Sequence, residues 1–328
     1  MESDKVLEIE NLSTAFQVGG KPVAVTKDIS FDIRRGEILG IVGESGSGKS
    51  VTAKTVMRLL PTPPSSVLSG TIALNGVELL NLSEREMEKI RGNKVAMIFQ
   101  EPMTALNPVY TCGDQIVEVV RKHQKLSKKA AREAALEMLK LVGIPMPEQR
   151  MKAYPHELSG GMRQRVVIAM ALSCKPELLI ADEPTTALDP TIQEQILELI
   201  RDLHDKTGMS VMYITHDLGV IAQTCTRVVV MYAGMIQEIA EVHELFHTTK
   251  HPYTMGLMKA MPKLGDKKER LYDIKGIVPH ITQMPDGCRF APRCPYASDR
   301  CHKECPSLTD TGNGHMVRCH RYLEITEG

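Results

Sequence analysis

The glycine-rich run from Gly43 to Ser50, GESGSGKS, constrains the fold of this chain more than any other feature. It matches G-x-x-x-x-G-K-[ST], a pattern that forms a tight loop between a β-strand and an α-helix. The apolar run from Ile38 to Val42 predicts the strand, and the helical composition of Val51 to Leu60 predicts the helix. A chain that contains this unit is expected to have an α/β fold.

The residues of this loop have the chemistry of a phosphate-binding site. Glycines let backbone N–H groups turn inward around phosphate oxygens, and the N-terminus of the following helix adds a favourable dipole. We expect Lys49 to reach the β and γ phosphates of a nucleotide and Ser50 to ligate Mg²⁺. The other residues expected to bind the nucleotide here are Gly43, Ser45, Gly46, Ser47, Gly48 and Val51. A chance glycine-rich turn is the alternative, and the flanking strand and helix argue against it.

Two acidic residues, Asp182 and Glu183, follow the apolar run from Leu178 to Ala181. The run predicts a buried strand, and the carboxyl ends of parallel strands lie at one edge of a sheet. We therefore expect Asp182 to position Mg²⁺ and Glu183 to act as the general base for the attacking water. Taken alone, an Asp-Glu pair after an apolar run is a weak signal.

Short β-branched runs at the N-terminus predict strands of an antiparallel layer. Gly70 to Leu80, which contains Asn75-Gly76, predicts a hairpin that returns to this layer. Further strands are predicted at Lys94 to Phe99 and at Ser210 to Ile214. Helices are predicted mainly over Tyr110 to Gly143, from near Ser159, and over the run that carries Ile192, Ile196, Ile200 and Leu203.

These elements predict an α/β fold with a parallel core sheet, an antiparallel β layer and a helical subdomain at about residues 101–165. Residues 1–250 are predicted to form one nucleotide-binding domain. After about residue 250 the composition changes to Pro, Gly, Cys and charge, with few periodic runs beyond Tyr253 to Met261. Residues 251–328 are therefore predicted to form a separate C-terminal extension.

Charge and hydropathy exclude several classes of protein. Forty Lys and Arg balance forty Asp and Glu, so the chain lacks the basic field that attracts proteins to nucleic acid or to anionic lipid. The longest apolar runs are far shorter than the roughly 18 residues of a spanning helix, and the first ten residues do not resemble a signal peptide. We expect a cytosolic protein whose membrane contacts are made through other proteins.

The run Leu158 to Arg165, LSGGMRQR, resembles the signature motif of ATP-binding cassette (ABC) proteins. Ser159, Gly160 and Gly161 open a helix, so that bare N–H groups and a hydroxyl can hold a γ phosphate. In isolation, an N-capped helix explains the run equally well. Together with the phosphate-binding loop and the acidic pair, however, the run identifies the chain as similar to this family.

The resemblance covers nearly the whole chain and implies that two such domains hold two ATP molecules between them. Ser159 would then serve the nucleotide of the partner, and Asp189 resembles the aspartate that crosses to the partner. Gln100 resembles the glutamine that touches magnesium or water and couples ATP to the membrane partner. His216 resembles the histidine that contacts the γ phosphate and orients Glu183. A surface glutamine and a structural histidine are the alternatives.

Phe16 stands where this family places an aromatic ring under the adenine base. Stacking of a base on such a ring contributes roughly 1 to 3 kcal/mol. The family more often has tyrosine at this position, and an aromatic side chain between strands is more often part of a core.

Four further runs resemble the ATPases of dipeptide and oligopeptide importers. They are Phe99 to Pro108, Tyr154 to Leu158, His251 to Thr254 and Gly287 to Pro295. This resemblance implies an ATP-hydrolysing subunit that is peripheral at the cytoplasmic face of the membrane. Its partners would be a second, paralogous ATPase, two permease subunits and, indirectly, an extracellular solute-binding protein. Nickel or another small solute is the alternative cargo.

Non-transport and export cassettes are the competing classes. A cassette ATPase acting on DNA or ribosomes would carry long coiled coils or two cassettes, which 328 residues of neutral charge without heptads do not match. An exporter or a purely regulatory cassette is disfavoured by the C-terminal extension and by the residues around Gln100.

Five of the eight cysteines lie in the last segment, which in a reducing compartment favours metal binding over disulfides. The resemblance implies an iron–sulfur cluster, with Cys288, Cys294, Cys301 and Cys319 matching the spacing of its ligands and Cys305 as an alternative fourth ligand. Four thiolates also suit tetrahedral zinc, although C-x-x-C pairs are lacking, and unligated thiols are the third possibility. A [4Fe–4S] cluster here is expected to hold the small extension together.

Overall fold

The structure, a computed structural model, describes residues 4–100, 105–186, 188–261 and 272–325. The chain divides into two compact units. The first contains Met1–Leu7, Ile33–Glu37 and Asn81–Tyr213, and the second contains Glu8–Asp32, Ile38–Leu80 and Ile214–Gly328. Each unit carries part of the predicted nucleotide site.

The first unit contains three neighbouring strands in the order β8-β7-β6. They are β6 (Val95–Ile98), β7 (Leu178–Asp182) and β8 (Ser210–Thr215), the last of which begins in this unit. β6 and β7 run parallel, with Val95 opposite Leu178. All residues of the three strands are buried, as expected for strands covered on both faces. The three predicted strands and the parallel pairing of β6 with β7 are confirmed.

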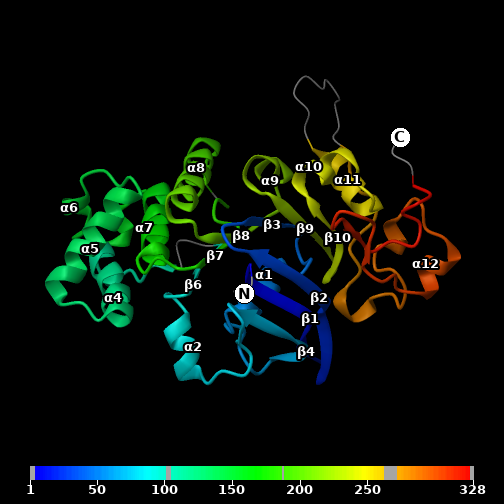
Figure 1. Ribbon diagram of the computed structural model, residues 1–328, viewed down its shortest axis with the longest axis horizontal. Coiled ribbons are helices and arrows are strands. Elements are labelled where there is room, and N and C mark those ends of the chain that lie inside the picture. Colours follow the sequence, from blue (N-terminus) through cyan, green and yellow to red (C-terminus); the bar gives the residue numbers. More distant parts are fainter. Residues whose placement is uncertain (1–3, 101–104, 187, 262–271, 326–328) are drawn as a thin grey trace. The chain divides into compact units, whose positions relative to one another are not determined.

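The helices of the first unit include a packed group of α4, α5 and α7, of which α7 also packs on β6 (Figure 1). The helical elements are α2 (Glu84–Ile90), α4 (Cys112–Gln124), α5 (Lys128–Leu141), α6 (Pro147–Arg150), the 3-10 turn η1 (Pro155–Glu157), α7 (Gly160–Leu172) and α8 (Pro190–Thr207). The predicted helical stretch from Tyr110 is two helices, because Lys125 takes a left-handed conformation (φ 54°) and Ser127 caps α5.

The second unit contains the predicted antiparallel layer, a four-stranded sheet in the order β2-β1-β4-β5. Its strands are β1 (Lys5–Val18) and β2 (Lys21–Arg34), which lie mainly in this unit, and β4 (Ser65–Leu74) and β5 (Val77–Glu78). β4 and β5 pair antiparallel around Asn75 and Gly76, whose φ angles of 49° and 77° suit a two-residue hairpin turn.

A second group of strands in this unit has the order β11-β12-β10-β9-β3. They are β3 (Ile38–Val42), β9 (Arg227–Tyr232), β10 (Met235–Glu241), β11 (Thr309–Asp310) and β12 (Met316–Val317). β3 is parallel to β9, and β9 turns back into the antiparallel β10 through Ala233 and Gly234. Residues of β3 are buried throughout, which places the start of the phosphate-binding loop on a rigid strand.

The helix after the loop, α1 (Lys49–Val56), begins earlier and ends earlier than the predicted Val51–Leu60. Arg58 takes a left-handed conformation with φ 49°. The N–H of Leu59 donates to Lys54 O at 2.8 Å, and the N–H of Arg58 donates to Thr55 O at 2.9 Å. This is a Schellman C-cap without glycine, which helical composition alone does not reveal.

The other helices of the second unit are short. They are α9 (Leu218–Thr224), α10 (Val242–His247), α11 (Pro252–Ala260), α12 (Asp299–Lys303) and the 3-10 turns η2 (Ile281–Gln283) and η3 (Ala291–Arg293). The helix predicted from Tyr253 is confirmed as α11. In the described ranges, no helix has the length and apolar character to cross a membrane.

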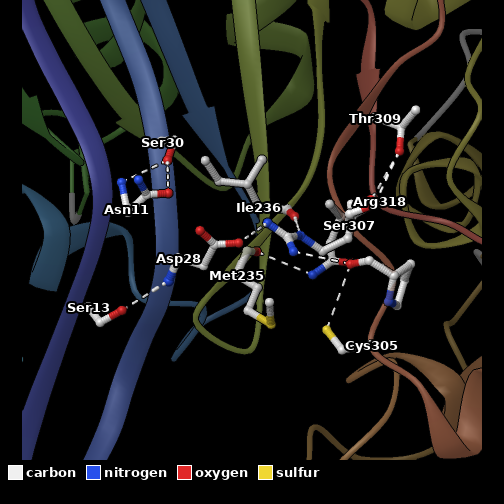
Figure 2. Close-up of polar contacts among 12 residues, drawn as sticks. Asn11, Ser13, Asp28, Ser30, Met235, Ile236, Cys305, Ser307, Thr309 and Arg318 are labelled. Carbon is white, nitrogen blue, oxygen red and sulfur yellow. Dashed lines mark hydrogen bonds and ion pairs between the residues drawn. The ribbon is translucent and has the colours of Figure 1, made fainter. Parts of the chain in front are cut away.

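The C-terminal residues extend the strands of the second unit. Val317 and Met316 of β12 pair with Glu238 and Ile239 of β10. Arg318 then donates to Ile236 O at 2.9 Å, to Pro306 O at 3.1 Å and to the Asp28 carboxylate at 3.0 Å (Figure 2). The residues after 250 are thus bonded to β2 and β10 of the same unit, and the domain boundary at residue 250 stays a prediction.

Candidate functional site

The phosphate-binding loop leads from β3 into α1, as its sequence pattern predicts. At Gly43 an added Cβ would lie 2.1 Å from the carbonyl oxygen of Met231 and 2.8 Å from Ser47 Oγ, so only glycine fits between the loop and β9. Gly46 and Gly48 take φ angles of 77° and 97°, which favour glycine. Ser47 is buried, whereas Ser45 and Gly46 are exposed at the tip of the loop.

Lys49 lies against the inner face of its own loop. Its Nζ donates to the carbonyl oxygen of Gly43 at 2.7 Å and to that of Glu44 at 3.1 Å, and lies 3.4 Å from Ser47 Oγ. The side chain is nearly fully buried. A compact ammonium group held at the mouth of a glycine-rich loop supplies the positive charge that phosphate oxygens require. Ser50 and Val51 follow in the first turn of α1 and are half-buried.

The acidic pair lies at the carboxyl end of β7 in the first unit. Asp182 is the last residue of the strand and is buried. Glu183 takes a left-handed conformation with φ 46°, which directs the chain sharply out of the strand. Its Oε2 accepts hydrogen bonds from Gln100 Nε2 at 2.9 Å and from Thr186 Oγ1 at 3.0 Å.

The structure thus brings Gln100 and Glu183 together, although 83 positions separate them in the chain. Gln100 follows β6 and Glu183 follows β7, and the two strands are parallel neighbours, so their carboxyl ends meet. The run that continues from Gln100 begins with residues 101–104, which lie outside the described residues.

Ser159 is the N-cap of α7, and its Oγ accepts the N–H of Met162 at 3.3 Å. Gly161 packs closely against α8, because an added Cβ would lie 2.8 Å from Ile192 Cγ2. Gly160 is exposed. Asp189 caps α8 in the same way, with its Oδ1 accepting the N–H of Ile192 at 3.0 Å. Both polar groups are therefore positioned by helix N-termini.

Sequence reasoning gave no role to Gln164 or Thr186. Gln164 is fully buried in α7, and its Nε2 donates to the carbonyl oxygen of Pro184 at 2.5 Å. This bond joins the helix of the signature motif to the turn that follows Glu183. The sequence signal for such a contact is weak, because Gln164 lies between two arginines and its burial does not follow from a regular apolar pattern.

His216 and Phe16 belong to the second unit. His216 is exposed immediately after β8, and the next residue, Asp217, caps α9 by accepting the N–H of Gly219 at 2.7 Å. Phe16 is half-buried on β1, between the buried Ala15 and the exposed Gln17. The roles predicted for these two residues stay predictions.

Four of the five C-terminal cysteines line one cavity in the second unit. Cys288, Cys294, Cys301 and Cys319 surround it together with apolar side chains such as those of Phe290 and Ile325. Burial raises the pKa of Cys288, Cys294 and Cys319 to about 11, so these thiols are neutral at pH 7 unless a cation is bound.

Cys305 does not line this cavity. It is exposed, and its Sγ lies 3.8 Å from the carbonyl oxygen of Pro306, which also accepts a bond from Arg318 (Figure 2). Among the residues that the structure describes, no three His, Cys, Asp or Glu side chains are arranged to hold a metal ion.

Comparisons with protein families match two parts of the chain. Residues 26–186 match the family described as ABC transporter, and residues 237–301 match the C-terminal region of oligopeptide/dipeptide transporters. The oligopeptide transport ATP-binding protein AppD of Bacillus subtilis is 50% identical over 319 residues, which are 97% of each chain. The dipeptide transport ATP-binding protein DppD of Escherichia coli is 47% identical over 319 residues, again 97% of each chain.

Among solved structures, the chain is similar to a dimeric ATP-binding cassette, MJ0796, in a post-hydrolysis state bound to ADP and Pi. The TM-score is 0.65 with 28% identity, over 72% of this chain and 98% of that chain. A second similar structure is cbiO1 from Clostridium perfringens, part of an ABC transporter complex, with a TM-score of 0.64 and 28% identity over 75% of this chain and 92% of that one.

Proposed function

The chain belongs to the family of ATP-binding subunits of peptide ABC transporters and is an ABC ATPase, and we propose that it powers the import of dipeptides or oligopeptides. The observation that carries the proposal is a likeness to peptide transport proteins over 97% of the chain, which includes the C-terminal region as well as the cassette.

The predicted nucleotide-binding residues of the two units have separate tasks in hydrolysis. Lys49 exchanges the carbonyl oxygens of its own loop for the β and γ phosphates of ATP, while the loop N–H groups hold the phosphate oxygens. Mg²⁺, held by Ser50 and Asp182 with Gln100, would offset the negative charge on the phosphates.

Glu183 acts as the general base that orients the attacking water. The bond from Gln100 Nε2 fixes its carboxylate, so a displacement of Gln100 would change the orientation of the base. This bond provides a route by which contact with a permease could control hydrolysis. His216 would contact the γ phosphate and orient Glu183.

The proposed assembly is a pair of cassettes on two permeases. Ser159, Gly160, Gly161 and Asp189 serve the ATP bound by the partner cassette, which we propose to be a paralogue, and Phe16 stacks on the adenine base. The subunit lies at the cytoplasmic face of the membrane, and an extracellular binding protein delivers the peptide.

Uptake into vesicles tests the cargo. The complex, reconstituted with its permeases and binding protein, is expected to accumulate a labelled dipeptide or oligopeptide only with ATP. A complex in which this chain carries Glu183→Gln should accumulate none. Uptake of nickel with no uptake of either peptide would contradict the proposed cargo and leave the ATPase unaffected.

We also propose that Cys288, Cys294, Cys301 and Cys319 hold a [4Fe–4S] cluster. Their sharing of one apolar cavity supports this, because four thiolates are the usual ligands of such a cluster. The gaps of five residues between Cys288 and Cys294 and of six between Cys294 and Cys301 lack the C-x-x-C pairs common in zinc sites, which favours a cluster over zinc. The cluster would crosslink segments of the C-terminal region.

Metal analysis of the chain purified without oxygen tests this assignment. About four iron and four sulfide per chain are expected. Cys288→Ser should lose them, whereas Cys305→Ser, the matched control outside the cavity, should retain them. Zinc alone would contradict the cluster, and equal losses in both variants would contradict the assignment of these four ligands.

A further inference from the structure

Glu44, the second residue of the phosphate-binding loop, is held by an arginine of the C-terminal region. Arg293 Nη1 lies 3.1 and 3.0 Å from the two carboxylate oxygens of Glu44. Its Nη2 donates to Ile274 O at 2.9 Å and its Nε to Lys275 O at 3.1 Å. The Arg293 side chain is 5% exposed. Because all three nitrogens have partners, this guanidinium is a rigid anchor for Glu44.

Tyr253 of α11 holds the backbone of the same loop residue. Its Oη accepts the N–H of Glu44 at 2.9 Å. The Tyr253 ring is fully buried against Tyr232 and Phe290, with ring centroids 4.7 and 5.4 Å away. Arg293 also stacks on Tyr232, with its guanidinium carbon 5.6 Å from the ring centroid. The aromatic group thus fixes both contacts to Glu44.

A second arginine supports the other side of the loop through the turn between β9 and β10. Gly234 in this turn donates its N–H to Ser47 O at 2.9 Å. Ala233 beside it has φ 47°, an unfavourable conformation for alanine. The buried Arg289 donates from Nη1 to the carbonyl oxygen of Ala233 and so holds the turn in place.

Both arginines come from the segment that lies between two cysteines. Arg289 follows Cys288, and Arg293 precedes Cys294, with the buried Phe290 between them. This short segment therefore contacts the phosphate-binding loop directly at Glu44 and, through the turn at Ala233, at Ser47.

We propose that the segment from Cys288 to Cys294 is a brace for the phosphate-binding loop, with Arg293 and Arg289 as positioning residues that raise the affinity for nucleotide. The brace consists of contacts among side chains and backbone, so it does not depend on which group the cysteines bind. If the cysteines prove not to hold a cluster, the proposal of the brace is therefore unaffected.

The expected effect is on binding more than on the chemical step. Lys49 takes one of its acceptors from the carbonyl of Glu44, so movement of Glu44 also moves the lysine that binds the phosphates. A loop held in its bound conformation loses less conformational freedom when nucleotide binds. Removal of the anchor should weaken binding, while hydrolysis at saturating ATP should change little.

The test is the dissociation constant of MgATP for the full-length chain carrying Arg293→Met. We expect binding about tenfold weaker than in the natural chain, the loss of one charge-assisted contact. In the assembled transporter, KM for ATP should rise and kcat should stay within about twofold. The matched control is Arg300→Met, which removes an exposed arginine paired with Glu304 in the same region.

Two further variants separate positioning from general damage. Tyr253→Phe keeps the buried ring and removes only Oη, so it should weaken the binding of MgATP with little loss of thermal stability.

Glu44→Ala removes the carboxylate that Arg293 contacts. Combined with Arg293→Met, it should weaken the binding of MgATP no further than either change alone. The proposal would be overturned if Arg293→Met bound MgATP as tightly as Arg300→Met does. It would also be overturned if the losses of Arg293→Met and Glu44→Ala added up in the double variant.

Discussion

Single residues at the site combine a strained backbone with specific hydrogen bonds. Glu183 has φ 46°, a conformation that costs a non-glycine residue of the order of 1 kcal/mol. Its carboxylate is nevertheless fixed by Gln100 and Thr186. At Gly43 the site needs a residue without a side chain, because Met231 O lies where a Cβ would be. Glu183 thus carries both a strained backbone and the reactive carboxylate, whereas Gly43 contributes only a close approach of backbone atoms.

Glu183→Gln should abolish hydrolysis and preserve ATP binding. The amide cannot accept a proton from water, so kcat should fall by about 10² or more, while the dissociation constant of MgATP stays within about twofold. Steady-state hydrolysis and equilibrium binding measure the two quantities. The control is Glu194→Gln on the exposed face of α8, which should leave kcat unchanged. A fall in affinity equal to the fall in kcat would contradict the role of general base.

Gly43→Ala should destabilise the fold more than Gly46→Ala. The new methyl at residue 43 meets Met231 O at 2.1 Å, which forces β3 and β9 to shift, and we expect a loss of about 1–3 kcal/mol. At residue 46 nothing lies within 4 Å and only the positive φ is unfavourable, so about 1 kcal/mol is expected. Denaturant unfolding of both variants measures the difference, and equal losses would rule out the close contact as its cause.

At the scale of elements, β10 is the strand to which the C-terminal region is attached. Glu238 on this strand is fully buried, and its Oε1 lies 2.8 Å from His315 Nε2. His315 Nδ1 lies 3.0 Å from the Glu244 carboxylate on α10. Burial opposes the charge of His315, but its bonds to the two carboxylates outweigh this, and its pKa is raised. His315, which immediately precedes β12, therefore links this strand to β10 and α10.

This ion pair should make stability depend on pH. Since the raised pKa means that the folded state binds the proton more tightly, the contribution is complete below the unfolded pKa of about 6.5 and is lost as the pH rises through the folded value. His315→Gln removes the titrating group. The difference in unfolding free energy between the natural chain and this variant should shrink from pH 6 to pH 9, and a constant difference would contradict the charged state of His315.

At the scale of the whole molecule, the C-terminal region and the phosphate-binding loop belong to one compact unit. The loop lies between β3 and α1, and more than 250 residues later the chain adds β12 to the strands of that unit. Damage to the last strand is therefore expected to reach the nucleotide site. A separate extension would unfold without this effect.

Val317→Asp tests the coupling. The side chain is fully buried on β12, so an unpaired carboxylate there should cost about 3 kcal/mol or more and abolish cooperative unfolding of the second unit together with ATP binding. Thr309→Asp on the neighbouring β11 is exposed and should change stability by less than about 0.5 kcal/mol. If Val317→Asp binds ATP normally, the region folds independently of the loop.

Much of the site could be predicted because its signals are local. The strands at β6, β7 and β8, the loop before α1 and the cap of α7 each depend on residues close together in the chain, so periodicity and spacing reveal them. The end of α1 could not be predicted in this way, because Arg58 takes a conformation usually left to glycine and donates from its side chain to Leu79 O at 3.2 Å.

The sequence by itself determined the ATPase family, the residues of the phosphate-binding loop and the order of strands and helices, since short motifs carry these. Tertiary structure alone decided that Cys305 is excluded from the shared cavity, that β12 pairs with β10, and that Arg293 holds Glu44 across 249 positions. The physical reason is that contacts between distant segments depend on how the elements pack, and no local pattern of residues encodes that packing.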